Sequence, residues 1–434
     1  MTIRANAFSC DITPKEQVHL AGFSGGRRLS TGVRDPLLAS AVHIRGGTGG
    51  IIVISLDLLC LDPEFTRSIR RRIVQATGTR EQNVFVGTTQ NHSGPPASTP
   101  MYRFGDESFA EPSEEYLAFV EEQAVQAASE SAVTSRPAAL AAVRLDKPNT
   151  GVIAVKDTGT GRLCAFIVVG SVIPAQLGAV NTEVSSDFLH EARQRIARGV
   201  GGEPVVAYFV ASSGEHRLNL DAAATGGPDA AAKAAEKLAQ EVVSNVKALA
   251  SADFTSKEDP SGKFSLVHGV RRKILPDIVE AGLMLESSRK SGARAEAAGS
   301  DRRMAKWSEM EAGFAMNFLV ARQNGRLIEA LEESDPAELQ VMNIGKTKLL
   351  GLPWVIFPEF GQEIAERAGG DVLIAECTNG DMQGSIISSD PSKPGSHRLL
   401  SPLFEPEDGE ALFEAAVSLV STTPKSAQGL FLVL

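Results

Sequence analysis

Short apolar runs rich in β-branched residues alternate along this chain with longer segments in which apolar residues recur every three to four positions. The runs of the first kind predict buried strands, and the clearest are 50–58 (GIIVISLDL), 83–89 (NVFVGTT), 163–171 (LCAFIVVGS) and 204–211 (PVVAYFVA). The segments of the second kind predict helices over 62–78, 111–132, 186–198, 228–249 and 359–368. Such alternation is typical of an α/β protein.

Local sequence patterns also predict the turn between the first two strands and the exposed face of the helix that follows them. GGTGG separates the strand-like segments 39–45 and 50–58 and is followed by a strand, whereas a phosphate loop needs a helix directly after it. It therefore predicts the turn of a hairpin. On the helix that follows, Arg67, Arg70 and Arg71 lie opposite the apolar face, and we expect them to be solvated.

The chain is expected to form a single domain over residues 1–434. The polar segment 251–262 is typical of a surface connection, and no internal repeat is visible in the sequence. Residues 286–306 (SSRKSGARAEAAGSDRRMAKW) are basic, small and polar, so they predict a mobile excursion or a lid.

Composition and charge narrow the class of protein. The 434 residues are 43% hydrophobic and 22% charged, which suits a globular chain with a sizeable core. Lys and Arg number 43 against 53 Asp and Glu, so the net charge of −10 disfavours a nucleic-acid partner. No apolar stretch approaches the roughly 20 residues that a membrane span needs. With a polar amino terminus and four scattered cysteines, the sequence predicts a soluble cytoplasmic protein with no membrane partner. It leaves the oligomeric state open.

A series of motifs extends over most of the chain. These are DITP at 11–14, LAGF at 20–23, GVRDPLLASAVHI at 32–44, TTQNHSGPP at 88–96, IPAQLGAVNTEVSSDF at 173–188, FVASSGEHRLN at 209–219, GLPWVIFPEFGQEI at 351–364 and TNGDMQGSIIS at 378–388. In this order they resemble the motifs of the neutral (alkaline, non-lysosomal) ceramidase family. The resemblance implies the fold of that family's catalytic domain, an α/β layered sandwich of sheets and helices.

The same resemblance implies zinc chemistry, because members of the family are amidases whose metal is held by two His, a Glu and a Tyr. The four ligand positions fall here on Gln90, Ile173, Val355 and Ser385, and the position of the nucleophilic serine falls on Arg217, just after Ser212 and Ser213. Isoleucine and valine have no donor atom for a metal. The sequence therefore predicts that this chain is not a zinc ceramidase and that it has no metal and no other cofactor.

The loops that would surround such a metal nevertheless carry polar and ionisable side chains. Buried groups of this kind lower stability unless they are used, so we expect them to serve a small-molecule substrate. The predicted catalytic residues are His92, Glu215 and His216. The predicted substrate-binding residues are Gln90, Asn91, Ser93, Arg217, Asn219, Arg27, Arg28, Asp187, Asn379 and Asp381.

The catalytic assignments follow from the chemistry of imidazole and carboxylate groups. His92 could act as an acid or base near neutrality, or it could cap the turn that begins SGPP. Glu215 could orient the imidazole of His216 only if the segment turns, because adjacent residues of a strand point in opposite directions.

Two of the binding assignments also have simpler interpretations. Arg217, together with Arg27 and Arg28, could hold a carboxylate or phosphate, although surface arginines are common. Asp187 lies at the start of a predicted helix, where capping is the simpler role.

Three functions remain open at this stage. The first is a metal-independent hydrolase, or lyase, that cleaves an amide, ester or related bond in a small polar or anionic substrate. The second is a non-catalytic relative that binds a ligand in the altered pocket. The third is a metal hydrolase whose ligands have been rearranged around His92, His216, Glu215 and Asp187.

Overall fold

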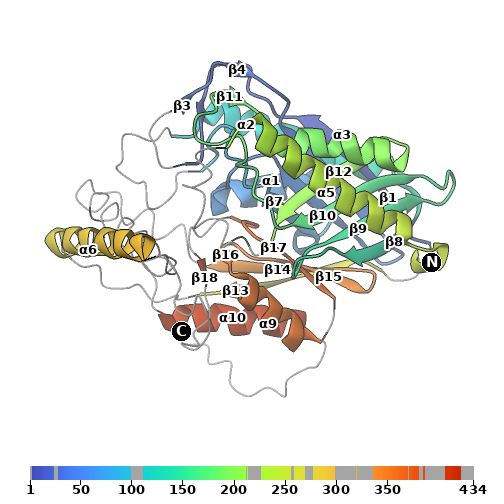
Figure 1. Cartoon of the computed structure of the whole chain (residues 1–434). Coiled ribbons are helices and arrows are strands. Elements are labelled where there is room, and N and C mark those ends of the chain that lie inside the picture. The colour runs from blue at the N-terminus through green and yellow to red at the C-terminus, as the bar shows by residue number, and fades with distance from the viewer. Residues whose placement is uncertain are drawn as a thin grey trace.

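The protein is built from four layers, helices on sheet on sheet on helices (Figure 1). The computed structural model describes residues 2–23, 28–98, 111–211, 213, 226–255, 259–268, 277–298, 319, 336–369, 371–380, 385–386 and 406–421. An α/β layered sandwich was the fold class expected from the sequence, and it is confirmed.

The larger sheet has eight strands, in the order β12-β10-β9-β8-β1-β5-β6-β7. Their bounds are β1 (Arg4–Asp11), β5 (Leu38–Arg45), β6 (Gly50–Leu56), β7 (Val84–Thr88), β8 (Arg136–Arg144), β9 (Gly151–Asp157), β10 (Leu163–Gly170) and β12 (Val205–Val210). β5 and β6 form the predicted hairpin around GGTGG. The interior pairs are antiparallel, whereas the edge strands β7 and β12 each lie parallel to their neighbour.

The smaller sheet has the order β13-β14-β15-β17 and packs on one face of the larger sheet. Its strands are β13 (Ser261–Val267), β14 (Ala337–Ile344), β15 (Thr347–Gly351) and β17 (Val372–Ala375). The strand-like run 163–171 illustrates the packing: Phe166 and Val168 face helices, while Ile167 and Val169 face the smaller sheet. Burial on both faces is why this run is continuously apolar instead of alternating.

Helices cover the two outer faces. On the larger sheet lie α1 (Pro63–Thr77), α2 (Glu114–Val133), α3 (Phe188–Val200) and α5 (Pro228–Ala248), and on the smaller sheet lie α9 (Pro358–Ala368) and α10 (Pro406–Val420). The positions of α1, α2, α3, α5 and α9 agree with the helices predicted from periodicity. Among the described helices, none has the length and apolarity that crossing a membrane requires.

One chain topology occurs three times, although the sequence shows no repeat. In each unit, three antiparallel strands are followed by a helix, a fourth strand parallel to the third, and a second helix. The units are β1-β5-β6-α1-β7-α2, β8-β9-β10-α3-β12-α5 and β13-β14-β15-α9-β17-α10. Because the topology is the same, β7, β12 and β17 hold equivalent places, and the loops that follow them become candidates for one shared site.

One expectation about α1 was wrong. Arg67 and Arg71 are solvated as predicted, but the Arg70 side chain is only 1% exposed. Its guanidinium pairs with Glu338 on β14 at 2.6 Å and lies over the ring of Phe264, 4.8 Å from its centroid. The helix pattern could not reveal this, because the compensating charge comes from a strand far away in the sequence.

The other described elements are short strands, the 3-10 helices η1 (Glu81–Asn83) and η4 (Ser251–Asp253), and one separate helix. The short strands are β2 (His19–Leu20), β3 (Arg28–Leu29), β4 (Gly32–Val33), β11 (Glu183–Val184), β16 (Val355–Ile356) and β18 (Ser385–Ile386). Helix α6 (Ile278–Ala297) includes the first part of the segment 286–306, and Figure 1 places it to one side of the layers. Residues 299–306 lie outside the described part, so a lid at 286–306 and a single domain over the whole chain stay predictions.

Candidate functional site

The segments that follow the three equivalent strands meet at one place. After β17, Glu376 donates its backbone N–H to Val210 O of β12 at 2.9 Å, and Asn379 donates to Val86 O of β7 at 2.8 Å. Main-chain hydrogen bonds therefore join the end of β17 to both other strands. The convergence of these loops, which the sequence suggested without establishing, is a property of the fold.

Glu376 is the ionisable group at this junction, and its side chain is fully buried. Its Oε1 accepts hydrogen bonds from the backbone N–H groups of Ser213 at 2.9 Å and Ile356 at 2.8 Å. Its Oε2 accepts from the Ser213 hydroxyl at 2.5 Å and from Gln90 Nε2 at 3.3 Å. Burial raises the pKa of Glu376 to about 7, although all four donors favour the ionised form.

Gln90 occupies a demanding backbone position at the end of β7. Its φ is 59°, in the left-handed region that side-chain-bearing residues seldom adopt, and the residue is fully buried. Its amide oxygen Oε1 is buried with no hydrogen-bond partner among the described residues. Such strain and such an unsatisfied acceptor are concentrated at functional sites in proteins. Both observations support the predicted binding role of Gln90, which stays a prediction.

His92 is held from several sides. Its backbone N–H donates to Pro174 O at 2.8 Å, its ring Nδ1 lies 2.8 Å from Gln90 O, and the ring packs edge-on against Phe23. The Arg28 guanidinium donates to the carbonyl of His92 at 2.7 Å. Arg28 is thus placed to position the His92 loop.

Gly22 leaves room for the His92 ring, which yields a first prediction. A Cβ at Gly22 would meet His92 Cδ2 at 2.4 Å, and its φ of 80° is left-handed. Gly22→Ala is expected to lower the free energy of unfolding by about 1–2 kcal/mol for the backbone and by a further 1–3 kcal/mol, approximately, for the overlap.

Gly78→Ala is the matched control, because Gly78 has a φ of 69° and open space around it. Chemical denaturation of both variants separates the overlap from the backbone effect. Equal losses would contradict a packing role for Gly22 against His92.

Asn91 and Ser93 make hydrogen bonds that tie loops together. Asn91 Nδ2 donates to Asp57 O at 3.1 Å and Ser185 O at 2.8 Å, while Asn91 Oδ1 accepts from Ser93 N at 3.0 Å. Ser93 Oγ accepts from Asn181 at 3.0 Å. Contact with a substrate stays a prediction for both residues.

Two aspartates near the site have structural partners. Asp57, which follows β6, forms a two-point ion pair with Arg193 of α3 at 2.6 and 2.8 Å. Asp187 caps α3 by accepting from Phe188 N at 2.8 Å, and it also accepts from Leu177 N at 2.9 Å. Burial raises the pKa of Asp187 to about 6, against those hydrogen bonds. Capping was the simpler interpretation of Asp187, and a role in binding substrate stays a prediction.

The remaining predicted residues divide into one that is described and several that are not. Asn379 follows Glu376 closely in the chain, has a φ of 60° and accepts a hydrogen bond from Arg70 at 2.9 Å. The others lie outside the described residues, and they are Arg27, Glu215, His216, Arg217, Asn219 and Asp381.

Three of the four positions that match zinc ligands come together, namely Gln90, Val355 and Ser385. Val355 is the register partner of Ser385, its neighbour Ile356 bonds to Glu376, and Gln90 bonds to the same carboxylate. Ile173 is fully buried in the core between the larger sheet and α3 and α5. Aliphatic side chains at two of the four positions do not fit a zinc ion. The described residues contain no group of three His, Cys, Asp or Glu side chains that could hold a metal.

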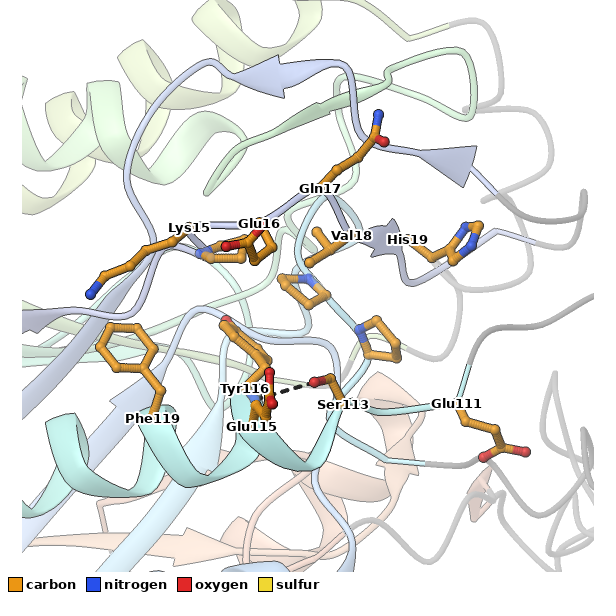
Figure 2. Close-up of a pocket in the computed structure, with 13 residues that line it drawn as sticks. Lys15, Glu16, Gln17, Val18, His19, Glu111, Ser113, Glu115, Tyr116 and Phe119 are labelled. Atoms are coloured by element: carbon orange, nitrogen blue, oxygen red, sulfur yellow. Dashed lines mark hydrogen bonds between the residues drawn. The ribbon is translucent and has the colours of Figure 1, made fainter.

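A hollow of about 450 Å³ lies between the amino-terminal loop and the start of α2. Pro95 and Pro96, which follow the His92 loop, line it together with Tyr116 and Phe119 of α2. Figure 2 shows Lys15 extended toward Phe119, and its Nζ lies 5.6 Å from that ring's centroid. The described lining includes none of the predicted site residues, so the hollow is a feature separate from the site.

Comparison with known proteins agrees with this architecture. Matching solved structures include a ceramidase complexed with C2, at a TM-score of 0.70 and 15% identity over 97% of this chain and 75% of that one. The neutral ceramidase from Pseudomonas aeruginosa matches at a TM-score of 0.67 and 15% identity over 97% of this chain and 74% of that one. Neither the protein-family models nor the curated proteins contain a match. The chain thus has the fold of the neutral ceramidases, which confirms at the level of fold the resemblance inferred from its motifs.

Sequence reasoning did not single out Glu376 or recognise its pairing with Ser213. Glu376 ends the run DVLIAE, and a carboxylate directly after a buried apolar strand is a signal that could have identified it. The sequence drew attention to Ser213 only as a neighbour of Arg217.

Proposed function

We propose that this protein is a metal-independent hydrolase that cleaves an amide, ester or related bond in a small polar substrate. The observation that supports this most strongly is the meeting of Gln90, Ser213 and Glu376 at the ends of three equivalent strands, fully or almost fully buried. A carboxyl group with a raised pKa among polar partners is typical of sites that transfer protons.

In this proposal His92, Glu215 and His216 supply acid and base chemistry. Gln90, Asn91, Ser93 and Asn379 line the substrate site with Arg28 and Asp187. Arg217, Arg27, Asn219 and Asp381 complete the polar set, and the arginines would serve an anionic group of the substrate.

A non-catalytic ligand-binding protein is the second candidate. The observation that favours it is burial: Ser213 is 1% exposed, and Gln90 and Glu376 are fully enclosed. Enclosure of this kind is typical of side chains that fix the loops around a ligand.

The proposal predicts that His92→Ala lowers kcat/KM by ~100-fold or more, as expected for loss of a general acid or base. The substrates would be p-nitrophenyl esters and anilides of short polar acids, and the enzyme would be treated with EDTA and checked for metal by elemental analysis. His268→Ala, which changes an exposed histidine after β13, is the matched control and should keep the wild-type rate.

Each other outcome points elsewhere. Full turnover in His92→Ala would remove that residue from the mechanism. Activity that EDTA abolishes and zinc restores would favour a metal hydrolase with rearranged ligands. No turnover of any substrate in the panel would favour the non-catalytic candidate.

A further inference from the structure

Ser213 and Glu376 form a closely fixed pair of side chains. The Ser213 hydroxyl lies 2.5 Å from Glu376 Oε2, and the Ser213 backbone N–H bonds to the other carboxylate oxygen at 2.9 Å. Ser213 comes shortly after β12, and Glu376 comes directly after β17. The ends of these two strands are joined, because Glu376 N donates to Val210 O at the end of β12. This two-point contact sets the position of the hydroxyl relative to its acceptor.

The partners of the carboxylate favour proton transfer over a static ion pair. All four hydrogen bonds to Glu376 come from neutral donors, namely the N–H and hydroxyl of Ser213, Ile356 N and Gln90 Nε2. In the described residues, every ion pair is formed by a carboxylate other than that of Glu376. Burial raises the pKa of Glu376 to about 7, which makes its carboxylate a stronger base than an exposed glutamate.

We propose that Ser213 is the nucleophile of this site and Glu376 its general base, so that bond cleavage proceeds through an acyl-serine intermediate. This rests on the proposed hydrolase function and names a route for it, and it gives to Glu376 the proton transfers that the proposed function assigned to His92, Glu215 and His216. It differs from the assignment implied by the ceramidase motifs, which placed the nucleophile position on Arg217.

The chemistry balances without a metal or a redox partner. Ser213 Oγ bonds to the substrate's carbonyl carbon, and its proton passes to Glu376 Oε2. The carbon–nitrogen or carbon–oxygen bond of the substrate then breaks, and the leaving amine or alcohol takes the proton from Glu376. Water next attacks the acyl carbon and gives a proton to Glu376, and the bond to Ser213 breaks as Oγ recovers that proton.

Gln90 fits this scheme as a hydrogen-bond donor to both Glu376 and the reacting oxygen. Its amide nitrogen has two hydrogens, and the bond to Glu376 Oε2 uses one of them. The second is available to the negative oxygen that forms when Ser213 attacks.

The test is covalent capture of Ser213 in the full chain with an alkyl fluorophosphonate, which forms an oxygen–phosphorus bond and releases fluoride. Intact mass and peptide mapping should find one adduct, on Ser213. The adduct should be absent in Ser213→Ala, and its rate should fall ~100-fold or more in Glu376→Gln. Ser129→Ala, the same change on α2, and Ser212→Ala should label at the wild-type rate.

Folding and function are separated by two further measurements. Ser213→Cys keeps a small side chain at this position and should unfold at the wild-type temperature, yet its phosphonylation should fall at least about tenfold.

No adduct on the wild-type protein, or an adduct that persists in Ser213→Ala, would overturn the proposal. Ester or amide turnover that survives in Ser213→Ala would also overturn it while the hydrolase function stands. An adduct without turnover of any substrate would support the nucleophile and contradict the hydrolase.

Discussion

Replacing Arg193 with leucine is expected to lower the free energy of unfolding by about 3–5 kcal/mol, the usual cost of removing one partner of a buried ion pair. The Asp57 side chain is 0% exposed and that of Arg193 12% exposed, and both guanidinium nitrogens bond to the carboxylate. Among the described residues, Asp57 would keep the Leu38 N–H, at 2.9 Å, as the hydrogen-bond partner of its carboxylate. Chemical denaturation at neutral pH measures the loss.

Arg195→Leu provides the matched control on the same helix. Arg195 pairs with Glu191 one turn away, and both side chains are more than a third exposed, so this change should cost no more than about 1 kcal/mol. Adding Asp57→Asn to Arg193→Leu should recover part of the loss, because the unpaired charge is then removed. Similar losses for the two arginines, with no recovery in the double variant, would show that the Asp57 pair does not hold α3 to the larger sheet.

Much of the fold was predictable because its determinants are local. The strand and helix positions follow from apolar periodicity, and the start of α1 follows from Asp62 and Pro63. The threefold topology was not predictable, because the three units share connections and strand directions without sharing side chains. Arg70 was misplaced for a similar reason: its partner, Glu338, is set by tertiary packing.

The site was predictable in location and less so in chemistry. Polar loops after apolar strands indicated Gln90 and its neighbours, and the structure brings Gln90 to the same carboxylate as Ser213. Glu376 was not predicted as a site residue, since no spacing rule links it to Ser213, which precedes it by more than a hundred positions. The contact between Ser213 and Glu376 forms where the ends of β12 and β17 meet, and these strands occupy equivalent places in their units.

The buried carboxyl group of Glu376 should also make the stability of this protein depend on pH. Its pKa is raised by burial from 4.5 to about 7. Below pH 4.5 the group is protonated in both the folded and unfolded chains, and its contribution to stability is fully present. Between pH 4.5 and 7 the unfolded chain ionises while the folded protein stays protonated, so the free energy of unfolding falls as pH rises. Because each pH unit between these two pKa values costs about 1.4 kcal/mol, the total loss is about 3 kcal/mol.

Glu376→Gln removes this ionisation and keeps a side chain of similar shape in the same cradle. The difference in unfolding free energy between wild type and variant, followed by denaturation from pH 4.5 to 8, should move by about 3 kcal/mol in favour of the variant as pH rises. Taking the difference cancels the contribution of Asp187, whose raised pKa has the same sign. Glu122→Gln, the same change at an exposed position of α2, should give a curve parallel to wild type. A parallel curve for Glu376→Gln as well would mean that Glu376 is ionised at acidic pH in the folded protein, through a charge partner beyond the hydrogen bonds described.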